Sequence, residues 1–395
     1  MSKKQTETIE KWIWLSLFKK ISKGKIHKLL SEFYTIDNIY DAQREDYEKL
    51  TFLKPEDISL LCEKDLSESR IYVSDLEKSN IFVLTKDMPE FPQMMNSYPN
   101  HPLILYCKGQ RINLNKYISV SVVGTRNPGQ YGKNITYTIA SELAKKGVII
   151  ISGMAEGADS IAHEACLNAN VPTVAVIGCG PDIVYPRSNA SLSKKICEKG
   201  MIISEYPPGT PPERFRFPER NKIIASLSPV TAVTEAAKKS GSLITANLAK
   251  KFGNILFAVP GNITSNLSDG TNILIGEGAH PITSKNDIFN FFVKTIGEEK
   301  VNKYTYKTYT NKCTDDNPYK QSEKNKNQEI NTQYLSYSDD EKENIILKCL
   351  CGNNLSIDKI SYETGFSLSQ LSSALLFMEI KGKIKKNPGD TYTAV

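Results

Sequence analysis

The sequence contains none of the short patterns that identify the common hydrolases and nucleotide-dependent enzymes. It has no H-E-x-x-H pair, no Walker loop and no G-x-G-x-x-G turn. Histidine is also scarce, since the chain has only His27, His101, His163 and His280. With so few histidines, no Ser-His-Asp set can be recognised. These absences argue against metalloprotease, P-loop and serine-hydrolase chemistry.

Cysteine occurs eight times but never as a C-x-x-C pair. Cys349 and Cys351 form a single C-x-C without a second pair, which disfavours a metal site there. Most of the others lie in apolar patterns, where a reduced cysteine behaves as a small hydrophobic residue. We therefore expect reduced thiols and a cytoplasmic protein.

Long apolar runs are missing as well. No run approaches the ~20 residues that a membrane span needs. The run from Trp12 to Phe18 follows acidic residues and precedes no small-residue cleavage site, so it predicts a helix face rather than a signal peptide. The net charge of +6 and the pI of about 8.6 are mildly basic. That balance permits an anionic partner without requiring one.

The length of 395 residues predicts two or three domains. Residues 1–75 have apolar residues at helical spacing, which predicts a small helical domain of the sterile-alpha-motif or helix-hairpin-helix kind. Residues 80–297 predict an α/β domain. Residues 298–338 are polar and rich in Lys and Asn, which predicts a linker. Residues 339–395 predict three helices and a hairpin, the arrangement of a winged helix-turn-helix.

The α/β domain contains short apolar runs that alternate with amphipathic segments. The runs are NIFVLT, PLILYCKG, YISVSVVG, GVIIISGM, PTVAVIGCG, GMIISEY, PVTAVTEA and NILFAVPG. Runs rich in β-branched residues and separated by helices predict a parallel sheet with helices on both faces. Ligands of such sheets gather at the carboxyl ends of the strands.

The predicted winged helix lacks the charge that a groove-reading helix usually carries. Its second helix is expected to end at Gly365 and its hairpin to turn at residues 387–390. Ser367 is a candidate N-cap of the third helix. Several residues of that helix are small and neutral, namely Ser367, Ser369, Gln370, Ser372 and Ser373, and no Lys or Arg appears before Lys381. This composition favours protein contacts or weak backbone contacts over base reading.

Three strands of the α/β domain are followed by turns that contain glycine and lead into helices. Glycine lets backbone N–H groups approach an anion, and a helix N-terminus adds positive potential. An ordinary tight turn without a ligand explains each one equally well, but three turns on one sheet edge favour a phosphate-binding surface. Helices are expected to begin near Tyr131, Ala158 and Gly241. The candidate binding residues in these turns are Gly124, Arg126, Tyr131, Gly153, Ser240, Gly241 and Ser242.

The segment RFRFPERNKIIASLSP, residues 214–229, places cationic side chains around two phenylalanines. A nucleic-acid strand without sequence preference is held by cations on its phosphates and by aromatic rings on its bases. The alternative is that one phenylalanine packs into the core, with Phe215 the better candidate for that position than Phe217. The candidate binding residues of this segment are Arg214, Phe217, Arg220, Asn221 and Lys222.

Catalytic candidates are few. Glu235 ends a strand close to the Ser240–Ser242 turn, where it could act as a general acid or base or could simply hold a loop. His163 has no evident partner in the sequence and is expected to be structural. Asp159 lies at a helix start, where capping explains it well.

Several of these motifs together resemble one family. The runs VVGTR, ISGMAEGADSIAHEACL, VYPRSNASL, ISEYPPGTPP, FPERNKIIASLS, TEAAKKSGSLITANLAKKFG, FAVPG and DGTNILIGEGA occur in order over residues 80–297. They closely resemble the DNA-processing protein A family (DprA, also called Smf). The resemblance implies an extended Rossmann fold that binds single-stranded DNA without catalysis and without a cofactor. It also implies loading of the RecA recombinase, homodimerisation and a setting in natural transformation.

The resemblance adds Asn189, in the run VYPRSNASL, to the candidate site. Two positions depart from the family pattern. The family often has arginine where this chain has Lys222, and glycine where it has Ser226. Lysine keeps the charge but loses the bidentate fork of arginine, so the geometry of phosphate binding is expected to differ slightly.

Two other functions compete with a single-strand-binding mediator. One is a Rossmann-type nucleotide-processing enzyme, similar to a phosphoribohydrolase, that uses Glu235 and the Ser240–Ser242 turn. The other is a transcription regulator whose sheet domain senses a nucleotide. The ordered motifs, the lack of a catalytic set and the winged helix favour the mediator. The nearly uncharged third helix argues against the regulator.

Overall fold

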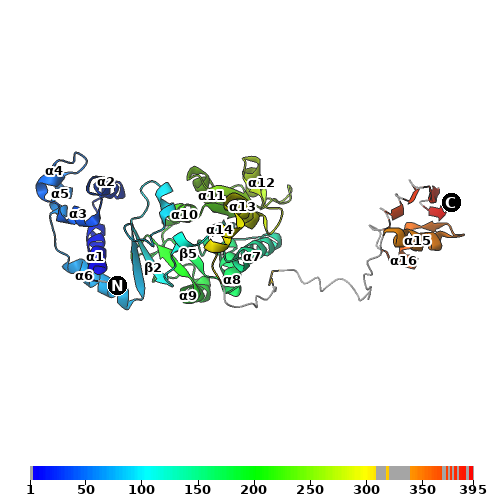
Figure 1. The fold of residues 1–395 in the computed structure, drawn as a ribbon, viewed down its shortest axis with the longest axis horizontal. Helices are drawn as coiled ribbons and strands as arrows, with labels where there is room; N and C mark the ends of the chain where they lie inside the picture. Colours follow the sequence, from blue (N-terminus) through cyan, green and yellow to red (C-terminus); the bar gives the residue numbers. More distant parts are fainter. Residues whose placement is uncertain are drawn as a thin grey trace. The chain divides into compact units, whose positions relative to one another are not determined.

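The computed structural model describes residues 3–307, 317–319, 339–366, 371, 374–375, 378–379, 382–387 and 391–394. The chain divides into two compact units, Met1–Lys320 and Gln321–Val395. Figure 1 shows a layered α/β body in the first unit, flanked by the N-terminal helices, and a small helical and stranded body in the second. In the described part of the chain, no helix is long and apolar enough to cross a membrane.

Six helices form the N-terminal layer: α1 Lys3–Leu17, α2 Lys23–Phe33, α3 Ile36–Asp41, α4 Arg44–Glu48, α5 Pro55–Leu61 and α6 Ser67–Lys78. Their buried residues recur at helical spacing and form a core of their own around Trp12, Leu29 and Tyr47. A second cluster joins α1 and α6 to the sheet through Ile81 and Tyr106. The N-terminal helices therefore pack directly against the α/β body.

The first unit is built on a nine-stranded sheet in the order β1-β2-β6-β5-β4-β3-β7-β8-β9. The strands are β1 Ile81–Thr85, β2 Ile104–Gly109, β3 Ser119–Val123, β4 Ile149–Ser152, β5 Thr173–Ile177, β6 Met201–Ser204, β7 Val230–Val233, β8 Ile255–Ala258 and β9 His280–Pro281. The seven strands from β6 to β9 in this order run parallel. This arrangement confirms the predicted α/β class.

The first two strands depart from the predicted parallel arrangement. β1 pairs with β2 antiparallel, and β2 pairs with β6 antiparallel. The stretch between β1 and β2 contains a short 3-10 helix, Gln93–Ser97, and no α-helix. A parallel neighbour needs a crossover, usually through a helix, whereas antiparallel strands do not. The apolar runs predicted strands correctly but carried no information on direction.

Helices cover both faces of the sheet. They are α7 Gln130–Lys145, α8 Ala158–Asn168, α9 Ala190–Lys199, α10 Arg216–Ser226, α11 Gly241–Lys251, α12 Asp269–Gly276 and α13 Asp287–Ile296. Alternate residues of one strand enter opposite cores, as Ile150 packs with α7 and α8 while Ile149 and Ile151 pack with α10 and α11. Both strand faces are thus apolar, which explains the continuous hydrophobic runs in the sequence.

The predicted linker at residues 298–338 begins too early. Helix α14, Glu298–Tyr304, is ordered, and its Val301 is completely buried. The Tyr306 N–H donates to the Gly147 carbonyl at 2.7 Å. Tyr319 also packs near Tyr137, with ring centroids 5.9 Å apart. These few apolar and aromatic residues bind the α/β body, although the average composition of the stretch is polar.

The second unit contains α15 Asp339–Leu350, β10 Leu355–Ser356, α16 Ile357–Thr364, β11 Ile384–Asn387 and β12 Thr391–Ala394. The strands form a sheet in the order β10-β12-β11, and α16 ends at Gly365 as predicted. Leu371, Leu375 and Met378 of the third helical segment are buried with residues of α15 and α16. The predicted N-cap at Ser367, the neutral positions Ser369, Gln370, Ser372 and Ser373, Lys381 and the turn at 388–390 lie outside the described residues.

Candidate functional site

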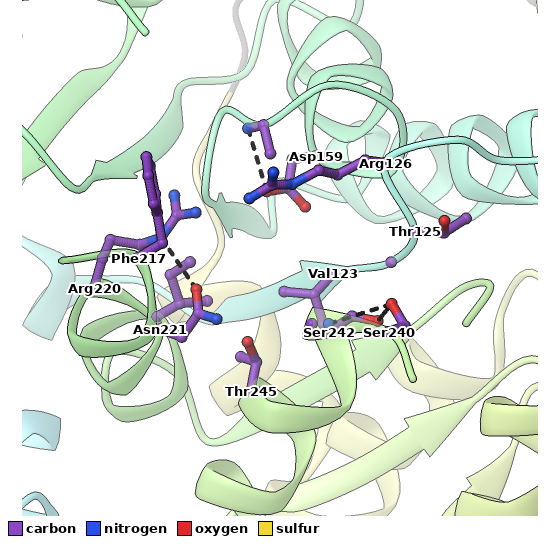
Figure 2. A pocket seen from close by; sticks show the side chains of 14 residues that line it. Val123, Thr125, Arg126, Asp159, Phe217, Arg220, Asn221, Ser240, Ser242 and Thr245 are labelled. Carbon is purple, nitrogen blue, oxygen red and sulfur yellow. Dashed lines mark hydrogen bonds between the residues drawn. The ribbon is translucent and has the colours of Figure 1, made fainter. Parts of the chain in front are cut away.

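A cavity of about 350 Å³ opens at the carboxyl ends of the parallel strands, where β3 is followed by the Gly124–Arg126 turn (Figure 2). Doubly wound sheets bind their ligands at this edge. Helices α8, α10 and α11 supply the rest of the wall. The cavity is lined by Val123, Gly124, Thr125, Arg126, Ala155, Asp159, Phe217, Arg220, Asn221, Ile224, Ser240, Gly241, Ser242 and Thr245.

The first glycine turn is fixed by its neighbours. The Thr125 N–H donates to the Glu235 carbonyl at 2.8 Å, and the Ala158 N–H donates to the Thr125 carbonyl at 3.1 Å. A Cβ on Gly124 would lie 2.7 Å from the Ala158 Cβ. Glycine is therefore required here because the helix and the turn approach closely. This packing holds the backbone from which Arg126 projects.

Arg126 is the exposed cation of the site. Its guanidinium carbon lies 5.8 Å from the ring centroid of Phe217. In the described part of the chain Arg126 has no carboxylate within ion-pair distance. Its donors therefore remain available to an anion, held in position beside an aromatic ring.

Arg220 is placed differently from Arg126, since only 5% of its surface is exposed. Its Nη1 donates to the Val176 carbonyl at 2.7 Å and to the Gly153 carbonyl. Its Nε donates to the Asn221 Oδ1 at 3.1 Å. A Cβ on Gly153 would overlap the guanidinium. The lack of a side chain at Gly153 therefore leaves space for the guanidinium of Arg220. Through its hydrogen bonds to the Gly153 and Val176 carbonyls, Arg220 connects α10 to the carboxyl ends of β4 and β5.

Asp159 is the buried acidic neighbour of Arg220. Burial raises the pKa of Asp159, and the positive charge of Arg220 opposes that rise. Burial likewise lowers the pKa of Arg220, and Asp159 opposes that shift. The carboxylate also accepts a hydrogen bond from the Ala155 N–H at 3.3 Å. Asp159 thus interacts electrostatically with Arg220, a role that the capping interpretation missed.

The two phenylalanines of this segment differ in exposure and position. Phe215 is 62% exposed, so the expectation that it packs into the core is wrong. It lies just before α10, whose buried face begins only at Arg220. Phe217 is half-buried, with its ring 5.3 Å from that of Tyr185 and 5.9 Å from the Arg220 guanidinium carbon. Phe217 consequently offers a supported ring on the wall of the cavity (Figure 2).

The third glycine turn begins α11. The helix starts at Gly241, as predicted. Ser240 is its N-cap, and its Oγ lies 2.8 Å from the Ser242 Oγ. A Cβ on Gly241 would meet nothing within 4 Å, so open space faces this backbone. The Ser242 N–H donates to the Ser240 Oγ at 3.4 Å and the Leu243 N–H to the Ser240 carbonyl at 3.1 Å. The helix dipole creates positive potential at this place. An anion could therefore be bound by the start of α11.

Lys238 and Lys239 are two residues that sequence reasoning missed. Both are exposed and directly precede the Ser240 cap. Neither has an ion-pair partner among the residues that the structure describes. Their position was visible in the quoted run TEAAKKSGSLITANLAKKFG, where they adjoin the glycine turn.

Five predicted binding residues do not line the cavity: Gly153, Tyr131, Asn189, Arg214 and Lys222. The Tyr131 hydroxyl donates to the Pro260 carbonyl at 2.9 Å. The Asn189 amide donates to the Met154 carbonyl at 2.9 Å and to the Ser160 hydroxyl at 3.0 Å. Lys222 pairs with Glu219 at 2.7 Å. Arg214 is exposed beyond the N-terminus of α10.

Glu235, the candidate acid or base, is held by the start of α7. Its Oε2 accepts a hydrogen bond from the Gly129 N–H at 2.8 Å, and the residue is only 4% exposed. Burial raises the pKa of Glu235, and this hydrogen bond opposes the rise. Glu235 does not line the cavity. The loop-holding interpretation therefore fits better than a catalytic one.

His163 has a structural environment. It is fully buried, and its Nδ1 lies 2.7 Å from the Thr173 Oγ1. Burial lowers the pKa of His163 to about 3, so the ring is neutral at physiological pH. In the parts of the chain that the structure describes, no three His, Cys, Asp or Glu side chains are grouped to hold a metal ion.

Comparison with known proteins identifies one family. The family profile described as DNA recombination-mediator protein A matches residues 82–293, and a DprA winged-helix profile matches residues 335–390. Protein Smf of Synechocystis is 33% identical over 340 residues, which cover 81% of this chain and 82% of that protein. DNA processing protein DprA of Bacillus subtilis is 39% identical over 200 residues, covering 51% and 67%.

Two solved structures are also similar. The crystal structure of DNA processing protein A from Streptococcus pneumoniae aligns with a TM-score of 0.60 and 32% identity, covering 68% of this chain and 93% of that one. DNA processing protein A from Helicobacter pylori aligns with a TM-score of 0.50 and 35% identity, covering 54% and 96%. The latter structure concerns a single-stranded DNA binding mode of that protein.

Proposed function

Since the chain belongs to the DNA recombination-mediator protein A (DprA/Smf) family, we propose that it binds single-stranded DNA at the β3–α7 edge and delivers it to the RecA recombinase. The observation that carries the proposal is the meeting of Arg126, Phe217 and the start of α11 around one cavity. These groups match the three needs of strand binding: an exposed cation, a ring for stacking and backbone donors.

The phosphates are assigned to Arg126 and to the Ser240–Ser242 turn. Arg126 supplies a fork of N–H donors, and the start of α11 supplies backbone N–H groups and the positive end of a helix dipole. Lys238 and Lys239 add charge at the rim of the turn. None of these groups reads a base edge, so the binding is expected to be largely independent of sequence.

The ring of Phe217 is assigned to a base. Its half-buried position and its contact with Tyr185 hold it in one orientation. A base that stacks on it must leave the double helix, because stacked bases in a duplex are covered on both faces. This requirement favours single strands over duplexes, whereas phosphate contacts alone would not.

The further steps of the proposed function are inferred from membership of the DprA/Smf family. We assign to the chain protection of incoming single strands, loading of RecA in natural transformation, homodimerisation and a cytoplasmic location. We assign no cofactor to this chain itself. The competing function, a phosphoribohydrolase-like enzyme, loses its acid–base candidate, because Glu235 is bound to the start of α7 outside the cavity.

Nuclease protection and RecA assembly test the proposal together. The full chain should protect a labelled single strand from an exonuclease and speed RecA filament formation on a strand coated with single-strand-binding protein. Arg126→Ala should reduce both effects, and sedimentation should show a dimer. Release of base or phosphate from nucleoside monophosphates, abolished by Glu235→Ala, would instead support the enzyme.

A further inference from the structure

A second groove, of about 420 Å³, lies between the N-terminal layer and the α/β body. Its walls include Trp12 of α1, Phe18 just after α1, Ile26 of α2, Tyr72 of α6 and Ile104 of β2. Phe18, Ile26 and Tyr72 are half-buried, so their apolar faces remain partly open. The function proposed above does not use this groove.

The groove lies at the same edge of the sheet as the candidate site. β6 is the neighbour of β5 and runs parallel to it, so Ser204 at its carboxyl end reaches this edge. β2 runs antiparallel to β6 and therefore begins at this edge, with Tyr106 opposite Ser204. Neighbouring strands are about 4.8 Å apart, so the start of β2 lies roughly 10 Å from the end of β5 along the edge.

The residues between the first cavity and the groove include aromatic and cationic side chains. The guanidinium carbon of Arg216 lies 5.2 Å from the ring centroid of Tyr206 and 5.2 Å from that of the exposed Phe215. Glu205, adjacent to Tyr206, pairs with Lys23 at 2.6 Å, and both line the groove. The segment 205–217 thus extends from the groove, which Glu205 lines, to the first cavity, which Phe217 lines.

The rim of the groove is basic. Lys19 lines it, and Lys20 is its neighbour; both are exposed. Neither lysine has an ion-pair partner among the described residues. Lys23 begins α2, whose N-cap Ser22 accepts a hydrogen bond from the Lys25 N–H. Free cations and the start of a helix therefore border an aromatic groove, a combination that suits a nucleic-acid strand.

We propose that the groove between the N-terminal helices and β2 is a second binding segment for the same DNA strand, which continues there from the cavity beside Phe217. Lys19 and Lys20 contact phosphates, and the rings of Phe18 and Tyr72 contact bases. The inference rests on the proposed single-strand binding at the first cavity and extends it to a longer strand.

The chain contains its own reporter for this groove. It has two tryptophans, both in α1. Trp12 lines the groove, and the Trp14 ring lies 5.1 Å from that of Phe18. A strand of about 6 nucleotides that fills only the first cavity should leave tryptophan emission unchanged, whereas one of about 20 nucleotides should quench it. A Trp12→Phe variant assigns the signal, and a duplex of equal length should not quench.

Charge reversal supplies the second measurement. The full chain carrying Lys19→Glu and Lys20→Glu should bind the short strand normally but the long strand roughly tenfold more weakly, with a log–log salt slope flatter by about 1.4 for two lost contacts. The matched control is Lys194→Glu with Lys195→Glu, an exposed adjacent pair on α9 that does not line the groove.

The possible results separate this inference from the proposed function. If no strand of either length binds, the proposed function fails and the inference fails with it. If both lengths bind but the long strand leaves tryptophan emission unchanged, or Lys19→Glu with Lys20→Glu matches its control, only the inference is overturned. Equal quenching by the duplex would also overturn it, because paired bases cannot stack on Phe18.

Discussion

Arg126 and Arg220 have the same side chain and line the same cavity, but their surroundings give them different roles. Arg126 is exposed, whereas Arg220 is buried and donates to backbone carbonyls. Both were expected from the sequence to contact phosphate. The sequence identified both arginines but could not show that Arg220 is buried and Arg126 exposed, because burial depends on how α10 packs against β4 and β5.

Replacement of Arg126 should affect binding and little else. Arg126→Ala removes an exposed, unpaired cation, so affinity for single strands should fall by about 1–2 kcal/mol, the scale of a charge-assisted hydrogen bond. The log–log salt slope should flatten by about 0.7. Fluorescence anisotropy measures both. Arg44→Ala, an exposed arginine on α4, is the control, and equal affinity for the two variants would remove Arg126 from the site.

Replacement of Arg220 should chiefly reduce stability. Arg220→Ala leaves Asp159 buried without its neighbouring cation and leaves two carbonyls with one donor fewer, a cost of about 3–5 kcal/mol. Burial raises the pKa of Asp159 in the folded protein. Ionisation of Asp159 therefore lowers the free energy of unfolding as the pH rises above the pKa of this carboxyl in the unfolded chain. Without Arg220 that pKa rises further, and the loss should be smaller in acid than at neutral pH.

Urea unfolding of wild type and of Arg220→Ala at acid and neutral pH measures this dependence. Adding Asp159→Asn should recover part of the stability at neutral pH, because the amide carries no charge. A variant that melts like the wild type and loses only DNA affinity would show that Arg220 contacts phosphate directly.

Phe217 and Phe215 form a natural pair for a test of stacking. Phe217→Ala should weaken single-strand binding by about 1–3 kcal/mol and leave the salt slope unchanged, because stacking releases no counterions. Phe215→Ala should have a smaller effect, since Phe215 does not line the cavity. Anisotropy over a salt series, with melting curves to exclude unfolding, distinguishes them. Equal losses for the two variants would contradict the assignment of the base to Phe217.

At the scale of elements, helix starts were predictable and strand directions were not. The starts of α7, α8 and α11 follow glycine turns, and the structure confirms all three. These signals are local, because a cap or a tight turn needs only a few residues. The antiparallel pairing of β1 and β2 depends on which strands meet in the folded sheet. No local pattern in their apolar runs carries that information.

The end of the α/β body gives an element-scale prediction. A fragment of residues 1–320 retains α14 and Tyr319 and should bind single strands within about twofold of the full chain, because the cavity lies wholly in the first unit. A fragment of residues 1–298 loses the buried Val301 and the Tyr306 contact with Gly147. It should melt at a lower temperature.

Anisotropy and thermal melting of the two fragments check this prediction. A folded 1–320 fragment that loses most of its affinity would show that residues 321–395 take part in strand binding. Equal melting temperatures for the two fragments would show that α14 and the Tyr306 contact add little stability.

At the scale of the whole molecule, the ordered sequence motifs predicted the candidate binding surface more specifically than the composition did. A net charge of +6 permits many partners, but the glycine turns, the arginines and Phe217 meet at one sheet edge. Eight of the thirteen predicted binding residues line the cavity: Gly124, Arg126, Phe217, Arg220, Asn221, Ser240, Gly241 and Ser242. The other five predicted residues do not line the cavity. The sequence could not show this, because contacts such as the hydrogen bond from the Tyr131 hydroxyl to the Pro260 carbonyl form only in the folded chain.

The most direct test of the account is the affinity of the full chain for matched single-stranded and double-stranded oligonucleotides over a series of salt concentrations. With about five phosphates neutralised, the account predicts tighter binding of the single strand and a log–log slope near −3.5, at roughly −0.7 per contact. Equal affinity for the duplex, or an affinity that does not change with salt, would contradict the central claim that one strand is held by stacking on Phe217 and by phosphate contacts at Arg126 and α11.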